Sequence, residues 1–324
     1  MLADNHGRTF DYLRIGLTDQ CNLRCQYCMP ADGLSWIPKS DLMSLEELKK
    51  ILQWSQSWGI KKVRFTGGEP LVRKDFMEIL SYAHELPFDS LHLTTNGVLT
   101  EKYLPELKNK GIHQINFSLD SLDPIQFERI TRRDQLSIVL SSISEALHLG
   151  FKVNVNTVLL SDTTQEECLK LINWSFEKGI HLRFIEEMPF NGQGKQPDWH
   201  WNWRRIEDMF MHYYPELKRV QAAPHSTSVS FEQSNQIGSI GYIAAYSRTF
   251  CGTCNRLRLT PNGQLHHCLY SEKFYPLLDA LRKGKKENEI LSEVQSFIQG
   301  KPINGFEAEK ENQNMGISMA KIGG

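Results

Sequence analysis

Six of the seven cysteines fall into two groups of three. The first group follows C-x₃-C-x₂-C and the second C-x₂-C-x₁₃-C, and their members are Cys21, Cys25 and Cys28, then Cys251, Cys254 and Cys268. Clustered thiols in a reducing compartment bind metal more often than they form disulfides. Three thiolates can hold three corners of a four-iron cluster and leave the fourth iron open to a substrate or cofactor. We therefore expect two metal sites, each with an open position.

Zinc is the alternative at both sites. A structural zinc ion needs four ligands, and the sequence around the first group supplies no fourth. At the second group, His266 or His267 could complete a Cys₃His site, and spacing alone does not decide between zinc and an iron–sulfur cluster. The seventh cysteine, Cys168, lies in a helical pattern, where we expect a small core residue.

Basic residues form the second chemical pattern. Arg256 and Arg258 are two apart on a predicted strand, so both face the same side, and paired arginines suit phosphate recognition. Three arginines and one lysine on other predicted strands add to this charge, namely Arg14, Lys62, Arg64 and Arg183. Cations inside a barrel need an anion to offset their lost hydration. Since the net charge is only −1, we expect a small polyanion such as a nucleoside triphosphate, and no nucleic acid.

Six strand–helix repeats must position these residues. The predicted strands span 12–17, 62–66, 91–95, 114–119, 152–160 and 181–186. Capping boxes at Ser44 and Thr164 start two of the intervening helices. This alternation predicts a parallel sheet of the α/β class. Six repeats rather than eight predict a partial (βα)₆ TIM-like barrel, with the first cysteine group on the loop after its first strand.

The rhythm ends after residue 187. A loop rich in Pro, Gly and Trp spans 188–203, followed by a short helix, short antiparallel strands, the second cysteine group and two helical segments at 275–284 and 286–299. We expect a barrel domain over 1–225 and a smaller α+β domain over 226–324 that closes the open side. No apolar run has membrane-spanning length and no secretory signal begins the chain, so we expect a cytoplasmic protein that does not bind membranes.

The motifs around the first cysteine group resemble the radical S-adenosylmethionine (SAM) superfamily. Tyr27 precedes the third cysteine, and TGGEP (66–70), TTNG (94–97) and SLD (118–120) follow in order at strand ends. In that superfamily, SAM chelates the open iron, and electron transfer yields methionine and a 5′-deoxyadenosyl radical. The resemblance implies that Tyr27, Gly68, Ser118 and Met188 line the SAM site.

Over its whole length the chain resembles the GTP 3′,8-cyclase family. The matching stretches are DYLRIGLTDQCNLRCQYCMP, KVRFTGGEPLVR, RFIEEMPFNG, FCGTCNRLRL and the terminal Gly323-Gly324. The resemblance implies two [4Fe–4S] clusters, one on each cysteine group, with guanine on the open iron of the second. The radical would take the ribose C3′ hydrogen, and the C3′ radical would attack guanine C8. The product is 3′,8-cyclo-7,8-dihydro-GTP, the first intermediate of molybdenum cofactor biosynthesis.

The resemblance also assigns the substrate contacts and the partners. The residues implied to contact GTP are Arg14, Lys62, Arg64, Thr94, Arg183, Arg256 and Arg258. Arg256 and Arg258, with Gly323-Gly324 at the tail, are implied to complete the catalytic pocket. An external electron donor would supply the electron for SAM cleavage, and cyclic pyranopterin monophosphate synthase would consume the product. The resemblance is also compatible with a homodimer.

Two positions depart from the family pattern. Asn154 stands where the family has a phosphate-binding lysine, although Lys152 lies two residues away on the same face, and Gln20 stands where the family often has arginine. Two rival functions fit parts of the sequence. One is a radical SAM peptide-modifying enzyme with an auxiliary cluster, and such enzymes usually carry more C-terminal cysteines. The other is a zinc-stabilised nucleotide-binding module without catalysis.

Overall fold

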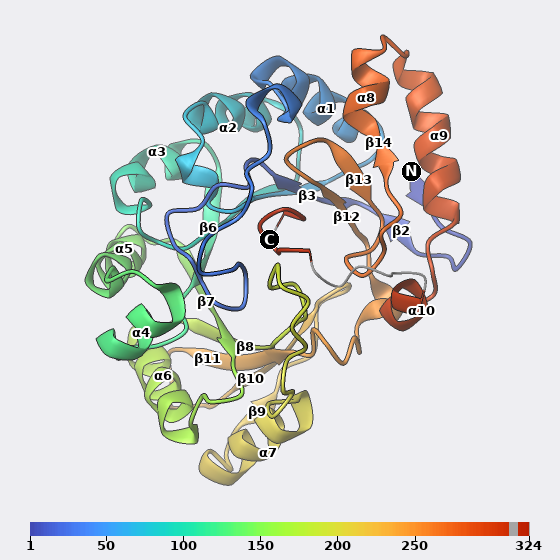
Figure 1. The fold of residues 1–324 in the computed structure, drawn as a ribbon. Coiled ribbons are helices and arrows are strands. Elements are labelled where there is room, and N and C mark those ends of the chain that lie inside the picture. The colour runs from blue at the N-terminus through green and yellow to red at the C-terminus, as the bar shows by residue number, and fades with distance from the viewer. Residues whose placement is uncertain (311–316, 324) are drawn as a thin grey trace.

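A computed structural model describes residues 1–310 and 317–323 of the chain (Figure 1). Its strands are β1 (Leu2–Ala3), β2 (Thr9–Phe10), β3 (Tyr12–Gly16), β4 (Lys62–Thr66), β5 (Ser90–Thr95), β6 (Ile112–Ser118), β7 (Lys152–Leu159), β8 (His181–Glu186), β9 (Lys218–Arg219), β10 (Ser228–Glu232), β11 (Ser239–Ile243), β12 (Arg256–Leu259), β13 (Gln264–His266) and β14 (Tyr275–Pro276). Its α-helices are α1 (Leu45–Ser57), α2 (Phe76–Glu85), α3 (Leu104–Asn109), α4 (Pro124–Thr131), α5 (Leu136–His148), α6 (Gln165–Lys178), α7 (Trp203–Tyr213), α8 (Leu277–Arg282), α9 (Glu287–Gln299) and α10 (Gly305–Lys310). Its 3₁₀ helices are η1 (Lys39–Asp41), η2 (Pro70–Val72), η3 (Glu101–Tyr103) and η4 (Cys251–Thr253).

One curved sheet of twelve strands organises the chain. Its order is β14-β13-β12-β3-β4-β5-β6-β7-β8-β11-β10-β9. The six central strands, β3 to β8, are parallel and follow chain order, which confirms the predicted βα repeats. Helices α1 to α6 surround these strands on the outside (Figure 1). The sheet curves without closing, so the predicted partial barrel is confirmed.

Local sequence signals set the helix ends of the barrel. The side chain of Ser44 accepts a hydrogen bond from the Glu47 amide, and Thr164 does the same for Glu167, as the two predicted capping boxes require. Helix α6 ends at Gly179, whose φ of 70° is a left-handed conformation that glycine adopts without a steric penalty. The helices therefore begin and end where short-range chemistry dictates.

The hydrophobic core lies between the sheet and the outer helices. Phe65, Phe117 and Phe184 are fully buried there, and Cys168 is also fully buried within this core. The prediction that Cys168 is a core residue is confirmed. Since the apolar side chains of the strands face outward to the helices, their polar side chains are left to face the interior of the barrel.

The C-terminal third extends the same sheet at both edges. Strand β11 pairs antiparallel with β10, as expected, but it also pairs parallel with β8. Strand β12 pairs parallel with β3 at the opposite edge. One of the expected antiparallel strands, β11, therefore also continues the barrel, because its apolar alternation fits either direction. The expected boundary near residue 225 falls between β9 and β10 and remains a proposal.

The last described residues of the chain lie inside the barrel. Helix α10, which the sequence did not predict, precedes the last residues, and residues 317–323 return to the centre of the barrel (Figure 1). No helix in the described ranges combines the length and apolar character that crossing a membrane requires.

Candidate active site

One cavity of about 990 Å³ occupies the interior of the barrel. Both cysteine groups line it, from the loop after β3 on one side and from η4 and β13 on the other. All seven residues predicted to contact GTP line it, namely Arg14, Lys62, Arg64, Thr94, Arg183, Arg256 and Arg258. The structure thus brings together residues that lie more than half of the chain apart.

The first cysteine group lies on a loop that hydrogen bonds anchor to the C-terminal end of α4. The amide of Cys28 donates to the Cys25 carbonyl at 2.9 Å, which makes a tight turn. The guanidinium of Arg132 donates to the carbonyls of Arg24 and Met29 at 2.7 and 3.0 Å. These bonds hold the backbone of the loop, so the three thiols do not depend on one another for position.

Burial dominates the electrostatics of these three thiols. It raises the pKa of Cys21 to about 12, with the Glu69 carboxylate adding to the effect, and it raises the pKa of Cys28 to about 11. Burial also raises the pKa of Cys25 far above its usual value. Three buried thiols that resist ionisation fit a site in which bound metal supplies the compensating positive charge.

The glycine-rich turn after β4 packs directly on the start of the cysteine loop. A Cβ on Gly68 would lie 2.2 Å from the Gln20 carbonyl oxygen, so no other residue fits without moving the backbone. The next residue, Glu69, accepts hydrogen bonds from the amide of Asn96 at 2.7 Å and the hydroxyl of Thr95 at 2.9 Å. Burial raises the pKa of Glu69 to about 7 against these bonds. Glu69 therefore ties TGGEP to TTNG.

The residues expected at the SAM site line one region of the cavity. Tyr27, Gly68, Ser118 and Met188 all contribute to its wall. The Tyr27 hydroxyl donates to Asp120 Oδ2 at 2.8 Å, and Asp120 Oδ1 accepts from the Val158 amide at 2.9 Å. The SLD segment thus fixes the tyrosine beside the cysteines. This role of Asp120 was not predicted, although it belongs to a quoted motif.

The second cysteine group is held by a turn and by one neighbouring lysine. The amide of Cys254 donates to the Cys251 carbonyl at 3.2 Å. Burial raises the pKa of Cys251 and Cys268. At Cys254 burial acts the same way, but the nearby charges of Lys301 and Arg256 outweigh it and lower the pKa to about 7. This group therefore has a thiol that ionises readily.

The histidines beside the second group are placed as core residues. His267 is 1% exposed and stacks on Phe297 with ring centroids 4.5 Å apart. Burial lowers the pKa of His266 to about 4 and of His267 to about 3. Within the described ranges, no three His, Cys, Asp or Glu side chains converge on a point that one metal ion could occupy, and this holds for the cysteine groups as well as for the histidines. The burial of His267 and its stacking on Phe297 give no support to the Cys₃His zinc alternative.

The strand register places the predicted cations in two rows across β12, β3 and β4. Arg256 pairs with Tyr12, which pairs with Lys62. Two residues further along each strand, a second row is formed by Arg258, Arg14 and Arg64. Because residues two apart face the same side, both rows point into the cavity, as expected for Arg256 and Arg258 from their spacing.

Tyr12 stands among these cations and was not predicted. Arg64 Nε donates to the Tyr12 hydroxyl oxygen at 2.6 Å. Although burial opposes ionisation, the charges of Arg64 and Arg14 lower the pKa of Tyr12 to about 7. Its position two residues before Arg14 was the available signal, because that spacing puts both side chains on the inner face. Tyr12 is therefore an acidic side chain that lies among the cations of this wall.

Burial and mutual repulsion destabilise the charged form of the cavity's arginines, both on this wall and at Arg183 on β8. Both effects, burial first, lower the pKa of Arg183 and of Arg258 to about 9. The Nε and Nη2 atoms of Arg183 have no hydrogen-bond partner within the described ranges. Buried donors left unpaired carry a free-energy penalty that a bound anion relieves. The cavity therefore fits a small polyanion.

Strands β6 to β8 line the cavity with neutral polar groups as well as with Lys152 and Arg183. Asn154 Nδ2 donates to Asn116 Oδ1 at 2.8 Å, and both side chains are buried. Burial and the charge of Arg183 lower the pKa of His181 to about 3, so this histidine is uncharged. Lys152 lines the cavity on the same side as Asn154, which agrees with their expected shared face. Positive charge is therefore densest on β12, β3 and β4 but also reaches the side formed by β7 and β8.

The end of the chain packs against the barrel next to the first cysteine group. The hydroxyl of Ser318 donates to the Cys28 carbonyl at 2.6 Å, and that of Thr66 donates to the Gly323 carbonyl at 2.6 Å. Gly323, with a φ of 81°, is placed in a left-handed conformation. Gly324, the other glycine predicted to act here, lies outside the described residues.

Two family models divide the chain between them. The model described as the radical SAM superfamily matches residues 15–175, and the model described as Molybdenum Cofactor Synthesis C matches residues 180–306. The two matches correspond to the barrel with its first cysteine group and to the segment with the second.

Curated relatives cover nearly the whole chain. GTP 3′,8-cyclase of Clostridium perfringens strain SM101 is 38% identical over 326 residues, with 100% of both chains covered. The mitochondrial GTP 3′,8-cyclase of Arabidopsis thaliana is 39% identical over 91% of this chain and 76% of the relative. Molybdenum cofactor biosynthesis protein 1 of Drosophila melanogaster is 36% identical over 93% of this chain and 54% of the relative. The chain thus spans roughly half the length of that animal relative.

A solved structure shares the architecture at low sequence identity. Streptococcus suis SuiB bound to S-adenosylmethionine superposes with a TM-score of 0.61 and 15% identity, over 88% of this chain and 68% of that chain. This likeness concerns the fold alone. The curated relatives share far more sequence, and together with the two family matches they show that the chain belongs to the radical SAM superfamily and, within it, to the GTP 3′,8-cyclase family.

Proposed function

We propose that this chain converts GTP to 3′,8-cyclo-7,8-dihydro-GTP in the first step of molybdenum cofactor biosynthesis. The observation that carries the proposal is the single cavity lined by two cysteine triads and by a cationic wall. One triad alone would serve many radical SAM reactions. The second triad and the cations together suit a substrate that has both a metal-binding base and a polyphosphate. The relatives named GTP 3′,8-cyclase support this choice.

Cys21, Cys25 and Cys28 would hold a [4Fe–4S] cluster, and SAM would occupy the adjoining wall. Bound there, the cluster and SAM supply reductive cleavage of the sulfonium and a radical that abstracts hydrogen. The chain's own contribution is to shape the site: Gly68 lets its turn pack on the backbone of the cysteine loop, Tyr27 is fixed by Asp120, and Met188 packs against the cluster that contains Phe190.

Cys251, Cys254 and Cys268 would hold a second [4Fe–4S] cluster whose open iron takes the guanine. The triphosphate would then lie along the cationic wall and reach Arg183, which has unpaired donors. Arg256 and Arg258 sit on β12, directly after Cys254, so the same strand that follows the cluster loop also presents phosphate ligands. Thr94 shares a hydrogen bond with Arg64 at 3.2 Å and would orient that guanidinium.

Two partners complete the proposal. An external electron donor would reduce the first cluster, and cyclic pyranopterin monophosphate synthase would consume the product. The peptide-modifying alternative is not favoured, because the relatives that share 36–39% identity are cyclases or molybdenum cofactor proteins. The cytoplasmic location and the homodimer remain predictions.

An anaerobic assay with GTP, SAM and dithionite tests the proposal. We expect 5′-deoxyadenosine and a cyclised nucleotide in equal amounts, and about eight irons per chain if both triads hold four-iron clusters. Omitting GTP should suppress SAM cleavage, and ATP in place of GTP is the matched control. Iron-loaded protein that cleaves SAM but forms no cyclised nucleotide from GTP would refute the proposed reaction.

A further inference from the structure

Lys301 is a buried ammonium group beside the second cysteine triad. It lies in the segment between α9 and α10, is 3% exposed, and its Nζ is 3.5 Å from Cys254 Sγ. The ring of Phe10 covers it at 4.5 Å from Nζ to the centroid. No carboxylate lies within ion-pair distance of Lys301 among residues 1–310 and 317–323. A buried cation without a carboxylate needs another source of negative charge.

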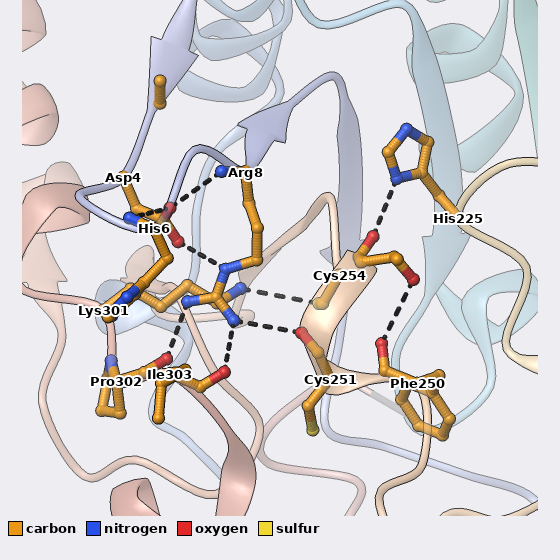
Figure 2. A network of polar contacts seen from close by, with 12 residues as sticks. Asp4, His6, Arg8, His225, Phe250, Cys251, Cys254, Lys301, Pro302 and Ile303 are labelled. Atoms are coloured by element: carbon orange, nitrogen blue, oxygen red, sulfur yellow. Dashed lines mark hydrogen bonds and ion pairs between the residues drawn. The ribbon is translucent and has the colours of Figure 1, made fainter.

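Arg8 fixes the segment that carries Lys301 to the turn that carries the cysteines. Its guanidinium donates to the Cys251 carbonyl at 3.0 Å, to the Ile303 carbonyl at 2.8 Å and to the Pro302 carbonyl at 2.7 Å. Figure 2 shows Arg8 and Lys301 reaching the cysteine turn from the two ends of the chain. The distance between Lys301 and Cys254 is thus set by Arg8.

Asp4 completes this arrangement by neutralising and orienting Arg8. Its Oδ2 lies 2.6 Å from Arg8 Nε, and its Oδ1 accepts from the Arg8 amide at 3.0 Å. The side chains of both are almost fully buried, at 0% and 6% exposed. Since Arg8 already has a carboxylate partner, the cations left to act on Cys254 are Lys301 and Arg256, and Lys301 has the stronger effect.

We propose that Lys301, positioned by the Arg8–Asp4 pair, sets the reduction potential and the iron retention of the second metal site. The inference rests on the proposed second cluster. A cluster becomes more negative on reduction, so a fixed cation next to one of its thiolate ligands favours the reduced form and raises the potential. The same cation stabilises the thiolate against loss of iron.

The test uses the full chain with Cys21→Ala, Cys25→Ala and Cys28→Ala, so that every iron–sulfur signal comes from the second triad. In this parent, Lys301→Met removes the charge and Lys301→Arg keeps it. Lys283→Met, which removes an exposed lysine after α8, is the matched control. Arg8→Lys keeps the charge of the clamp, but the three N–H groups of one ammonium cannot replace the four contacts that Arg8 makes with Asp4 and the three carbonyls.

Redox titration followed by electron paramagnetic resonance gives the midpoint potential, and iron release to a chelator gives retention. We expect Lys301→Met to lower the potential and to release iron roughly tenfold faster, with recovery in Lys301→Arg and no change in Lys283→Met. The Arg8→Lys protein should also release iron faster, because the charge is kept but Lys301 is no longer held in position beside the cysteine turn. A Lys301→Met protein that holds iron and titrates like the parent would overturn the inference.

The same experiment distinguishes failure of the proposed function from failure of the role of Lys301. If the parent itself binds no iron or sulfide after anaerobic reconstitution, the second cluster does not exist, and both proposals fall. If the parent has a normal cluster but Lys301→Met has the parent's potential, only the role of Lys301 is wrong. Thermal unfolding of each apo-variant shows whether a lost signal reflects a lost fold.

Discussion

Gly16, the last residue of β3, and Gly323, near the end of the chain, pack backbone against backbone. A Cβ on Gly16 would lie 2.9 Å from the Cα of Gly323 and 3.0 Å from Pro261 Cδ. The hydrogen bond from Thr66 to the Gly323 carbonyl runs beside this contact. The tail therefore depends on the absence of a side chain at a position that lies about three hundred residues earlier in the chain.

Gly16→Ala should expel the tail while leaving both cysteine triads in place. We expect nucleotide cyclisation to fall at least tenfold, because a contact under 3.0 Å must be relieved by moving the tail and not the sheet. Iron content and SAM binding should stay near their original values. Deletion of Gly323 and Gly324 is the comparison, and both changes should give the same product pattern. Full cyclisation in either variant would contradict a catalytic role for the tail.

Tyr12 should titrate near neutral pH in the nucleotide-free protein. Its pKa is lowered from 10 to about 7, so the tyrosinate contributes stability that is present above pH 10 and is lost as the pH falls through 7. A bound triphosphate neutralises the surrounding cations and should raise this pKa, so that GTP binding near pH 8 takes up a proton. The tyrosinate absorbance, with Tyr12→Phe as the blank, measures the titration.

Calorimetry in buffers of different ionisation enthalpy provides the independent check on Tyr12. The number of protons taken up on GTP binding near pH 8 should fall markedly in Tyr12→Phe, while the mutant binds GTP at lower pH much as the parent does. A nucleotide-free protein that shows no tyrosinate signal below pH 9 would contradict this prediction.

Short-range and periodic signals carried most of the fold. The apolar strands, the glycines that end helices and the capping boxes at Ser44 and Thr164 were sufficient to predict six βα repeats. The parallel pairing of β11 with β8 was not predictable in this way, because alternation is the same for parallel and antiparallel strands and the partner is chosen by tertiary packing.

Some residues of the site could also be predicted from sequence spacing, and others could not. Arg256 and Arg258 could be identified as site residues from their spacing on one strand, and the cysteines from the spacing within each group. Arg8 and Lys301 give no such signal, since they are separated by nearly the whole chain and meet only when the sheet brings β12 beside β3. Residues that act through another residue's backbone carbonyl leave no pattern in composition or period.

Arg183 should contribute to GTP affinity through its unpaired donors. Arg183→Met should weaken GTP binding roughly 10- to 100-fold, the value of one or two hydrogen bonds to a charged group. Binding of SAM and the content of both clusters should be unchanged, because Arg183 lies on β8 and not in a cysteine loop. Arg219→Met, an exposed arginine on β9, is the control. GTP affinity equal to that of the unmodified protein would remove Arg183 from the site.

Gly68→Ala should separate SAM binding from nucleotide binding. The new Cβ would meet the Gln20 carbonyl oxygen at 2.2 Å and the Asp19 carbonyl oxygen at 2.6 Å, both of which are backbone atoms that cannot rotate away. The turn must therefore shift toward the cavity where SAM is expected, and we predict loss of most SAM affinity and of 5′-deoxyadenosine formation. GTP affinity should persist, because the cationic wall on β12, β3 and β4 is built from other residues. Equilibrium binding of each ligand to the same preparation measures both effects, with Gly300→Ala, whose Cβ would meet its nearest atom, the Phe297 carbonyl oxygen, at 3.4 Å, as the matched control. Equal losses of SAM and GTP binding would show instead that the substitution disturbs the barrel as a whole.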